Sequence, residues 1–387
     1  MSTGVSILGS TGSIGETALR VIRHLSGSFH VTGLAAGQNV QRLSEQVEEF
    51  RPKVVSVAEL QHAAELKLRF PDLEVLYGTY GATMVAEMPE ARTVVAAIVG
   101  SEGLAPTYRA VQKGKRVALA NKESLVMAGR LVMDAAHRSG AEILPVDSEH
   151  CAVFQCLRGE SPKHVRKIIL TASGGSLRDA SLHELEAAPR EQVLSHPTWK
   201  MGRKITVDSA TMMNKGLEVI EAHHLFGIPI DAISVLMHRQ SVVHSLVEFV
   251  DGSLMAQLAS ADMALPVQYA LTYPLRSPGL QSSVDLAAVK TLCFDDPDPR
   301  RYPCLSLARQ AAVTSEAHTI ALNAANEVAV AAFLDGFIPF GAMPRLISKV
   351  LDATFPTTPG ELEQVLALHR AATELARAHL SGLGCAR

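Results

Sequence analysis

The chain has 387 residues, a length that predicts two or three domains. Hydrophobic residues make up 47% and charged residues 19%, as in ordinary globular proteins. A formal net charge of −3 excludes global attraction to nucleic acid or an anionic membrane, so any anion site must be local. No apolar run approaches the roughly 18 residues that span a bilayer. Five cysteines, an odd number, without a secretory signal favour reduced thiols in a cytoplasm, with a mature organellar form as the alternative.

Residues 1–146 alternate between short apolar runs and helix-like segments. This pattern predicts a parallel sheet covered by helices, which is a Rossmann-type domain. The predicted strands are Val5–Leu8, His30–Ala35, Val54–Val57, Thr93–Ile98, Arg116–Leu119 and Glu142–Val146. The predicted helices include Ile14–His24, Val40–Phe50 and Leu104–Lys113.

The rest of the chain loses this alternation. Residues 147–275 predict a central α+β catalytic domain, in which the loop at 195–203 contains proline and glycine and is interpreted as a lid. Residues 276–303 are rich in proline and acid, as linkers are. Residues 304–387 predict a C-terminal helical bundle. The predicted fold class is therefore α/β, with these three parts in order.

The first turn after a predicted strand carries three glycines, Gly9, Gly12 and Gly15. Glycines at such a turn allow the backbone to approach a pyrophosphate, whose charge the amides of the following helix then bind. The spacing GxxGxxG differs from the commoner GxGxxG, so a glycine-rich turn without a ligand is the alternative. The position between a strand and a helix favours a dinucleotide site.

The end of the second predicted strand indicates which dinucleotide is bound. An Asp or Glu about 20 residues past the glycines usually binds the ribose 2′-hydroxyl of NAD. Residues 35–39 contain no acid, and Arg42 follows one turn later, where it could assist a 2′-phosphate. The sequence therefore favours NADPH over NADH.

Asp147, Ser148 and Glu149 follow the last predicted strand. In an extended chain alternate side chains point to the same side, so the two carboxylates are expected to face the same way. Two neighbouring carboxylates are costly unless a cation or a proton neutralises them. The alternative is a helix N-cap, which explains one of the acids.

A second cluster lies in Asp208–Glu218, which combines hydroxyl donors, an amide, a lysine and acids. Ser209, Asn214 and Lys215 suit a phosphate, as neutral donors with one point charge. Glu218 supplies a third carboxylate. Oxygen ligands without cysteine or histidine favour Mg²⁺ or Mn²⁺.

Six segments together resemble the signature segments of the 1-deoxy-D-xylulose 5-phosphate reductoisomerase family, in the family's order and at comparable spacing. The resemblance extends over the whole chain, including its helical C-terminal part. The segments are Gly9–Gly15, Ala120–Ser124, Asp147–His150, Ser173–Gly175, His196–Lys204 and Asp208–Glu218.

The resemblance implies a role for each matching position. The metal ligands would be Asp147, Glu149 and Glu218, and the catalytic residues Lys122, Glu149 and Glu218. The substrate would be bound by Lys122, Ser148, Glu149, Ser173, His196, Trp199, Ser209, Asn214, Lys215 and Glu218. NADPH would be bound by Thr11, Gly12, Ser13, Ile14, Gly37, Gln38, Asn39, Asn121, Glu123 and Gly202.

The implied reaction is an isomerisation followed by a reduction. A divalent metal, Mg²⁺, Mn²⁺ or Co²⁺, would polarise the ketone of 1-deoxy-D-xylulose 5-phosphate. Carbon migration, by retro-aldol and aldol steps or by a ketol shift, and hydride from NADPH would give 2-C-methyl-D-erythritol 4-phosphate in the non-mevalonate isoprenoid pathway. The resemblance further implies a cytoplasmic homodimer whose partner is this small phosphosugar, with no nucleic acid and no membrane.

Two other functions fit part of the sequence. A different NADP dehydrogenase, such as one acting on an amino-acid semialdehyde, would need an activated cysteine beside a histidine. Cys151 adjoins His150, although sequence neighbours on a helix do not face each other. A nucleotide-sensing module would explain residues 1–146 but leave the cluster Asp208–Glu218 without a purpose.

Overall fold

The computed structural model describes residues 2–355 and 359–383, which pack as two compact units. Unit 1 contains the residues up to 124, residues 132–151 and residues 262–282; unit 2 contains residues 125–131, 152–261 and those from 283 onward. The division predicted in chain order, with boundaries after residues 146, 275 and 303, stays a prediction. Among the described residues, no helix combines the length and the apolar character that a membrane crossing requires.

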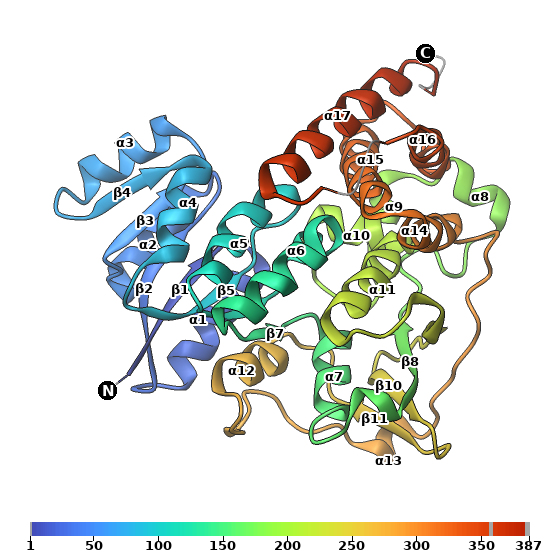
Figure 1. The fold of residues 1–387 in the computed structure, drawn as a ribbon, viewed down its shortest axis with the longest axis horizontal. Coiled ribbons are helices and arrows are strands. Elements are labelled where there is room, and N and C mark those ends of the chain that lie inside the picture. Colours follow the sequence, from blue (N-terminus) through green and yellow to red (C-terminus); the bar gives the residue numbers. More distant parts are fainter. Residues whose placement is uncertain (1, 356–358, 384–387) are drawn as a thin grey trace. The chain divides into compact units, whose positions relative to one another are not determined.

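Unit 1 is built on a seven-stranded sheet with the order β4-β3-β2-β1-β5-β6-β7, in which neighbouring strands are parallel (Figure 1). The strand order reverses at β1, as in doubly wound dinucleotide-binding folds. The predicted α/β fold class is thereby confirmed. The strands are β1 (Thr3–Leu8), β2 (Phe29–Ala35), β3 (Val54–Val57), β4 (Glu74–Tyr77), β5 (Ala91–Ala96), β6 (Arg116–Leu119) and β7 (Ile143–Pro145). The helices that begin in this unit are α1 (Ser13–His24), α2 (Val40–Phe50), α3 (Leu60–Arg69), α4 (Gly78–Glu87), α5 (Leu104–Gln112), α6 (Glu123–Ser139), α7 (Ser148–Cys156) and α12 (Ala264–Thr272).

Burial explains which strands were visible in the sequence. The side chains of β3 are all buried, and strands covered on both faces read as continuous apolar runs. By contrast, β4 lies at the edge of the sheet and its side chains are partly or fully exposed. Its sequence therefore carries no apolar run, and this strand was not among the predicted ones.

Helix α12 belongs to unit 1, although it follows the strands of unit 2 in sequence. It contacts α1 and the strands β6 and β7. Arg20 Nη2 donates to Asp262 Oδ1 at 2.9 Å, and Arg116 Nη1 donates to the carbonyl of Tyr273 at 2.7 Å. These polar contacts attach one end of the helix to α1 and the other end to strand β6.

Unit 2 contains a mixed sheet with the order β11-β10-β8-β9, which confirms the predicted α+β character of this part of the chain. Helix α11 covers one face of the sheet, because its Val219 and Ala222 share a core with Ile168 and Leu170. The strands are β8 (Val165–Ala172), β9 (Ile233–Met237), β10 (Val243–Phe249) and β11 (Leu254–Leu258). The helices are α8 (Leu182–Glu186), α9 (Arg190–Val193), α10 (Arg203–Ala210), α11 (Met213–Phe226), α13 (Leu286–Val289), α14 (Pro303–Thr314), α15 (Glu316–Leu334), α16 (Ala342–Leu351) and α17 (Leu362–Leu380).

The C-terminal helices confirm the predicted helical bundle. Helix α15 packs against α14, α16 and α17 (Figure 1), and most of its alanines are buried. The core of the bundle also includes Val207 of α10 and Leu217 of α11. The bundle therefore supports the two helices that carry the cluster Asp208–Glu218.

A buried carboxylate connects α10 to the bundle. Asp208 is 2% exposed, and its Oδ1 accepts a hydrogen bond from Asn326 Nδ2 at 2.8 Å. Its Oδ2 accepts from Lys204 Nζ at 2.9 Å. Since a buried charge is costly without such partners, Asn326 on α15 helps to fix the end of α10.

We predict that Asn326→Ala lowers the free energy of unfolding by about 1–3 kcal/mol, because it leaves one oxygen of a buried carboxylate without its donor. Denaturation in urea measures this change. Gln310→Ala, which removes an exposed amide from α14, serves as the control and is expected to change stability by less than about 0.5 kcal/mol. Equal effects of the two substitutions would contradict the role of Asn326.

Candidate active site

The carboxyl ends of the neighbouring parallel strands β6 and β7 lead to Lys122 and Asp147. Parallel strands end at the same edge of a sheet, so the two side chains meet, and Lys122 Nζ forms an ion pair with Asp147 Oδ2. The Lys122 side chain is 6% exposed and that of Asp147 is 15% exposed. The pair places one fixed carboxylate at the edge where ligands of such sheets bind.

Asp147 immediately precedes helix α7. Its Oδ1 accepts from the amide of Ser148 at 3.1 Å, and its carbonyl accepts from the amide of Cys151 at 2.8 Å. Ser148 and Glu149 therefore lie in the first helical turn, and the expectation of extended chain here is wrong. The local hydrogen bonds agree with the alternative, in which Asp147 begins a helix. Glu149 still lies beside the helix N-terminus, and its Oε2 accepts from Ser148 Oγ.

Unit 2 contributes the third predicted carboxylate. Glu218 on α11 is fully buried, and its Oε2 accepts from Lys215 Nζ while its Oε1 accepts from Asn214 Nδ2. The Lys215 side chain is only 4% exposed. Three of the residues predicted to contact substrate or metal are thus hydrogen-bonded to one another on one helix.

A glycine turn brings Ser173 to the end of α10. Gly174 and Gly175 have φ of +87° and +70°, which favours glycine. A Cβ atom on Gly175 would lie 2.7 Å from the Cα of Ala210 and 2.7 Å from the carbonyl oxygen of Ser209. Only glycine therefore allows this turn to approach α10, and the predicted phosphate residues Ser173 and Ser209 lie on backbone segments that touch.

His196 organises the predicted lid loop. Its Nδ1 accepts from the amides of Thr198 at 3.1 Å and Trp199 at 2.9 Å. The neutral ring therefore carries its proton on Nε2, which lies 3.0 Å from Ser173 Oγ and donates to it. Burial, and then the charge of Arg178, lower the pKa of His196. Trp199 is half-buried.

The glycines of the first turn have distinct structural reasons. Gly9 has φ of +86°, and a Cβ atom on Gly15 would lie 2.3 Å from the carbonyl oxygen of Gly9. Gly12 precedes α1 and offers no side-chain cap to the first helical amides. Gly12 and Ser13 are exposed in this turn, whereas Thr11 and Ile14 are half-buried. An open helix N-terminus of this kind fits a pyrophosphate.

The predicted adenosine end follows β2. Gly37, Gln38 and Asn39 are exposed, and Asn39 Oδ1 accepts from the amide of Arg42 at 3.1 Å, which begins α2. The Arg42 side chain, expected to help with a phosphate, is instead bound to Glu16 at 2.6 Å.

The remaining predicted cofactor contacts lie in both units. Asn121 Nδ2 donates to the carbonyl of Gly100 and to Glu123 Oε2, both at 3.0 Å. Asn121 and Glu123 are almost fully buried. Gly202 is exposed and precedes α10 in unit 2.

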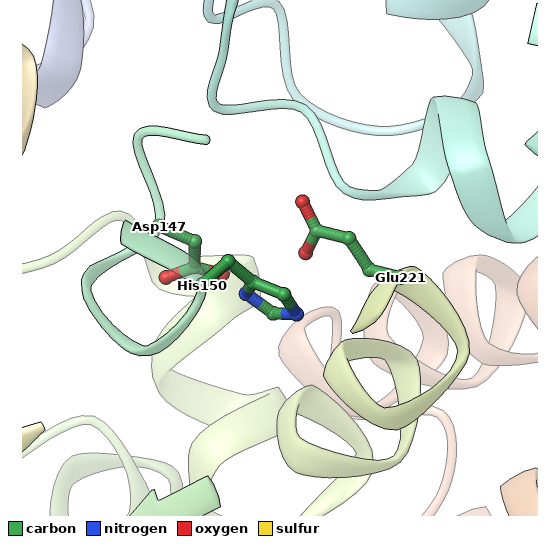
Figure 2. A group of neighbouring side chains, drawn as sticks. All are labelled: Asp147, His150 and Glu221. Carbon is green, nitrogen blue, oxygen red and sulfur yellow. The ribbon is translucent and has the colours of Figure 1, made fainter. Parts of the chain in front are cut away.

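Two buried titratable residues were not among the predicted site residues. His150 lies on α7 one turn after Asp147, and Glu221 lies on α11 one turn after Glu218, as Figure 2 shows for His150, Asp147 and Glu221. Both His150 and Glu221 have no exposed surface. Their i+3 spacing from two predicted ligands was the only signal available in the sequence.

Cys151 and Cys156 do not support a semialdehyde dehydrogenase with a nucleophilic cysteine. Cys151 is 1% exposed, although it adjoins His150 in the sequence. Burial raises the pKa of Cys156 to about 11. An activated nucleophile needs the opposite, an accessible thiol with a lowered pKa.

Comparisons with known proteins cover almost the whole chain. Family models described as 1-deoxy-D-xylulose 5-phosphate reductoisomerase, its C-terminal domain, and the DXP reductoisomerase C-terminal domain match residues 5–129, 143–226 and 258–375. A protein of that name from Chlorobium phaeovibrioides is 50% identical over 380 residues, which cover 97% of this chain and 99% of the relative.

Two solved structures are similar along their full length. A crystal structure of DOX-P reductoisomerase in complex with NADPH, fosmidomycin and magnesium has a TM-score of 0.93 and 40% identity, and the match covers 98% of each chain. The reductoisomerase from Zymomonas mobilis in complex with NADPH has a TM-score of 0.92 and 41% identity, over 99% of this chain and all of the other.

We predict that acid releases the loop around Trp199. The folded protein favours the neutral form of His196, because its pKa is lowered from the ordinary histidine value of 6.5. The neutral ring therefore stabilises the loop above pH 6.5, and this stabilisation is lost as the pH falls through the lowered pKa. Protonation of Nδ1 removes the acceptor for the amides of Thr198 and Trp199. Emission of Trp199, the only tryptophan, is expected to change as the pH falls below the ordinary histidine value of 6.5. His196→Gln should abolish this transition, whereas His183→Gln, an exposed control on α8, should keep it; a transition that survives in His196→Gln contradicts the assignment.

Proposed function

Because the chain belongs to the 1-deoxy-D-xylulose 5-phosphate reductoisomerase family, we propose that Asp147, Glu149 and Glu218 bind the divalent cation on which its reaction depends. The chain is an NADP-dependent oxidoreductase. It isomerises and reduces 1-deoxy-D-xylulose 5-phosphate to 2-C-methyl-D-erythritol 4-phosphate, with NADPH and a divalent metal, in isoprenoid precursor synthesis. The observation that carries the assignment is the match along the full length of both chains.

The donor set fits a hard cation. The three proposed ligands offer only carboxylate oxygens, which Mg²⁺ and Mn²⁺ prefer, and Co²⁺ is a further candidate. Asp147 and Glu149 belong to unit 1 and Glu218 to unit 2. When bound, such a cation supplies Lewis-acid polarisation of substrate oxygens.

At the reacting end of the substrate we assign three residues of unit 1. Lys122, fixed by Asp147, stabilises negative charge that develops on an oxygen of the substrate. Ser148 donates a hydrogen bond from the first turn of α7. Glu149 acts there as metal ligand and as substrate contact.

The substrate's phosphate is assigned to unit 2. Ser173 and Ser209 supply hydroxyl donors on touching segments, Asn214 an amide and Lys215 a positive charge. Ser173 Oγ accepts from His196, so its own proton is available to the phosphate.

The lid over this phosphate is assigned to the loop at 195–203. Trp199 is its half-buried aromatic residue and lies 6.3 Å from the ring of His244, centroid to centroid. The ring gives the loop an apolar surface with which to exclude water from the bound substrate.

NADPH is assigned to the edge of the parallel sheet, where it supplies the hydride. Thr11, Gly12, Ser13 and Ile14 surround the open helix N-terminus that fits a pyrophosphate. The exposed turn of Gly37, Gln38 and Asn39 receives the adenosine. The remaining proposed contacts are Asn121, Glu123 and Gly202.

We further propose a homodimer that works in the cytoplasm. Strand β11 is the edge of the unit 2 sheet, and its Leu254 and Met255 are 53% and 43% exposed. An edge strand with exposed apolar side chains is a surface on which a second copy can pack.

The proposed cytoplasmic location is supported by the cysteines. Cys151, Cys156, Cys293 and Cys304 are free thiols, as a reducing compartment favours.

The function is tested by following NADPH oxidation with 1-deoxy-D-xylulose 5-phosphate, with and without Mg²⁺ or Mn²⁺. Turnover is expected only when substrate and metal are both present. Oxidation that continues after chelation of all divalent metal would contradict the proposed site.

We predict that Glu218→Gln weakens Mn²⁺ binding by about 100-fold or more, since loss of residues that only support metal ligands already costs 10–100-fold. Electron paramagnetic resonance of free Mn²⁺ measures the affinity without any turnover. The control is Glu363→Gln, an exposed glutamate of α17, which should leave Mn²⁺ affinity unchanged. Similar affinities in both variants would exclude Glu218 as a ligand.

A further inference from the structure

The turn after β2 lacks a cation that can bind a 2′-phosphate. Residues 36–39 contain no lysine or arginine. The next cation, Arg42, donates from Nε and Nη2 to Glu16 at 2.6 and 2.8 Å, and from Nη1 to Glu45. The hydrogen bond from Arg42 lowers the pKa of Glu16, so this carboxylate is ionised at neutral pH. The guanidinium of Arg42 is therefore bound by two carboxylates and is not available to a 2′-phosphate.

The neighbouring strand β3 brings a carboxylate to the same turn. The carbonyl of Gly37 accepts from the amide of Ala58 at 3.2 Å, so the ends of β2 and β3 are connected. Gln38 Nε2 donates to Glu59 Oε1 at 3.1 Å, and Gln61 Nε2 donates to Glu59 Oε2 at 2.8 Å.

Glu59 occupies the N-cap position of α3, where the helix dipole favours a negative charge. It is the residue before α3, but its side chain makes no capping hydrogen bond to that helix. In the described part of the chain, no lysine or arginine forms an ion pair with it. The carboxylate of Glu59 accepts hydrogen bonds from two neutral side-chain amides, those of Gln38 and Gln61. Gln38 is itself one of the proposed adenosine contacts.

The two reduced dinucleotides differ only at the adenosine 2′-position. A carboxylate beside the ribose accepts from a 2′-hydroxyl, whereas a 2′-phosphate needs a positive partner and is repelled by a carboxylate. In the sequence this acid was hidden, because it follows β3 and lies 20 residues after the turn that it faces.

We propose that Glu59 sets the dinucleotide preference of this chain. Its carboxylate favours the 2′-hydroxyl of NADH and opposes the 2′-phosphate of NADPH, so the chain binds NADH within about tenfold of its affinity for NADPH. The inference rests on the proposed adenosine site at Gly37, Gln38 and Asn39.

The test is the dissociation constant of each dinucleotide, measured by fluorescence of the reduced nicotinamide without substrate. Glu59→Gln keeps the shape and removes the charge, so the constant for NADPH is expected to fall at least about fivefold while that for NADH does not fall. Gln38→Arg places a cation beside Glu59 and should also favour NADPH alone. Glu65→Gln makes the same charge change on the exposed face of α3 and is the matched control.

The inference is overturned if the ratio of the two constants in Glu59→Gln equals that in Glu65→Gln. It is also overturned if the unchanged chain prefers NADPH by more than about tenfold. If the unchanged chain binds neither dinucleotide, the proposed function itself fails. If both dinucleotides bind but Glu59→Gln does not alter the ratio of their dissociation constants, only the inference about Glu59 fails.

Discussion

Asp147 and Glu218, two carboxylates of the proposed metal centre, have little or no exposed surface, and each lies beside a lysine. The pair of Lys122 and Asp147 forms where β6 and β7 end, and the pair of Lys215 and Glu218 forms within α11. Burying a carboxylate is costly unless a cation and hydrogen bonds replace its water. Each unit therefore has to hold its acid and its lysine in a fixed arrangement. A divalent cation requires its carboxylate ligands in the ionised state.

Much of the fold could be predicted because buried parallel strands carry continuous apolar runs, as β3 and β6 do. The elements that were not predicted depend on tertiary contacts, which leave no pattern in the local sequence. Strand β4 is an exposed edge, and α12 is attached to unit 1 by residues distant in sequence, such as Arg20 and Asp262. No periodicity within residues 147–275 reveals that attachment.

The candidate site was predictable where residue type and spacing carry the chemistry, as in the glycine turn after β1 and the residues of α11. The site was not predictable where another side chain determines the local conformation or binds a candidate residue. Ser148 and Glu149 are helical because Asp147 begins α7, although the sequence alone also allowed extended chain. Arg42 is unavailable to a phosphate because Glu16 binds it across α1 and α2.

The most direct test of the proposed centre is a crystal structure of the protein grown with Mn²⁺, in which anomalous scattering locates the ion. We predict one strong peak bound by oxygens of Asp147, Glu149 and Glu218, at about 2.1 Å, a distance typical of small divalent cations. Glu218 would then have exchanged part of its contact with Lys215 for the metal. An ion held by Asp147 and Glu149 alone, with Glu218 still paired only with Lys215 and Asn214, would contradict the proposed chemistry.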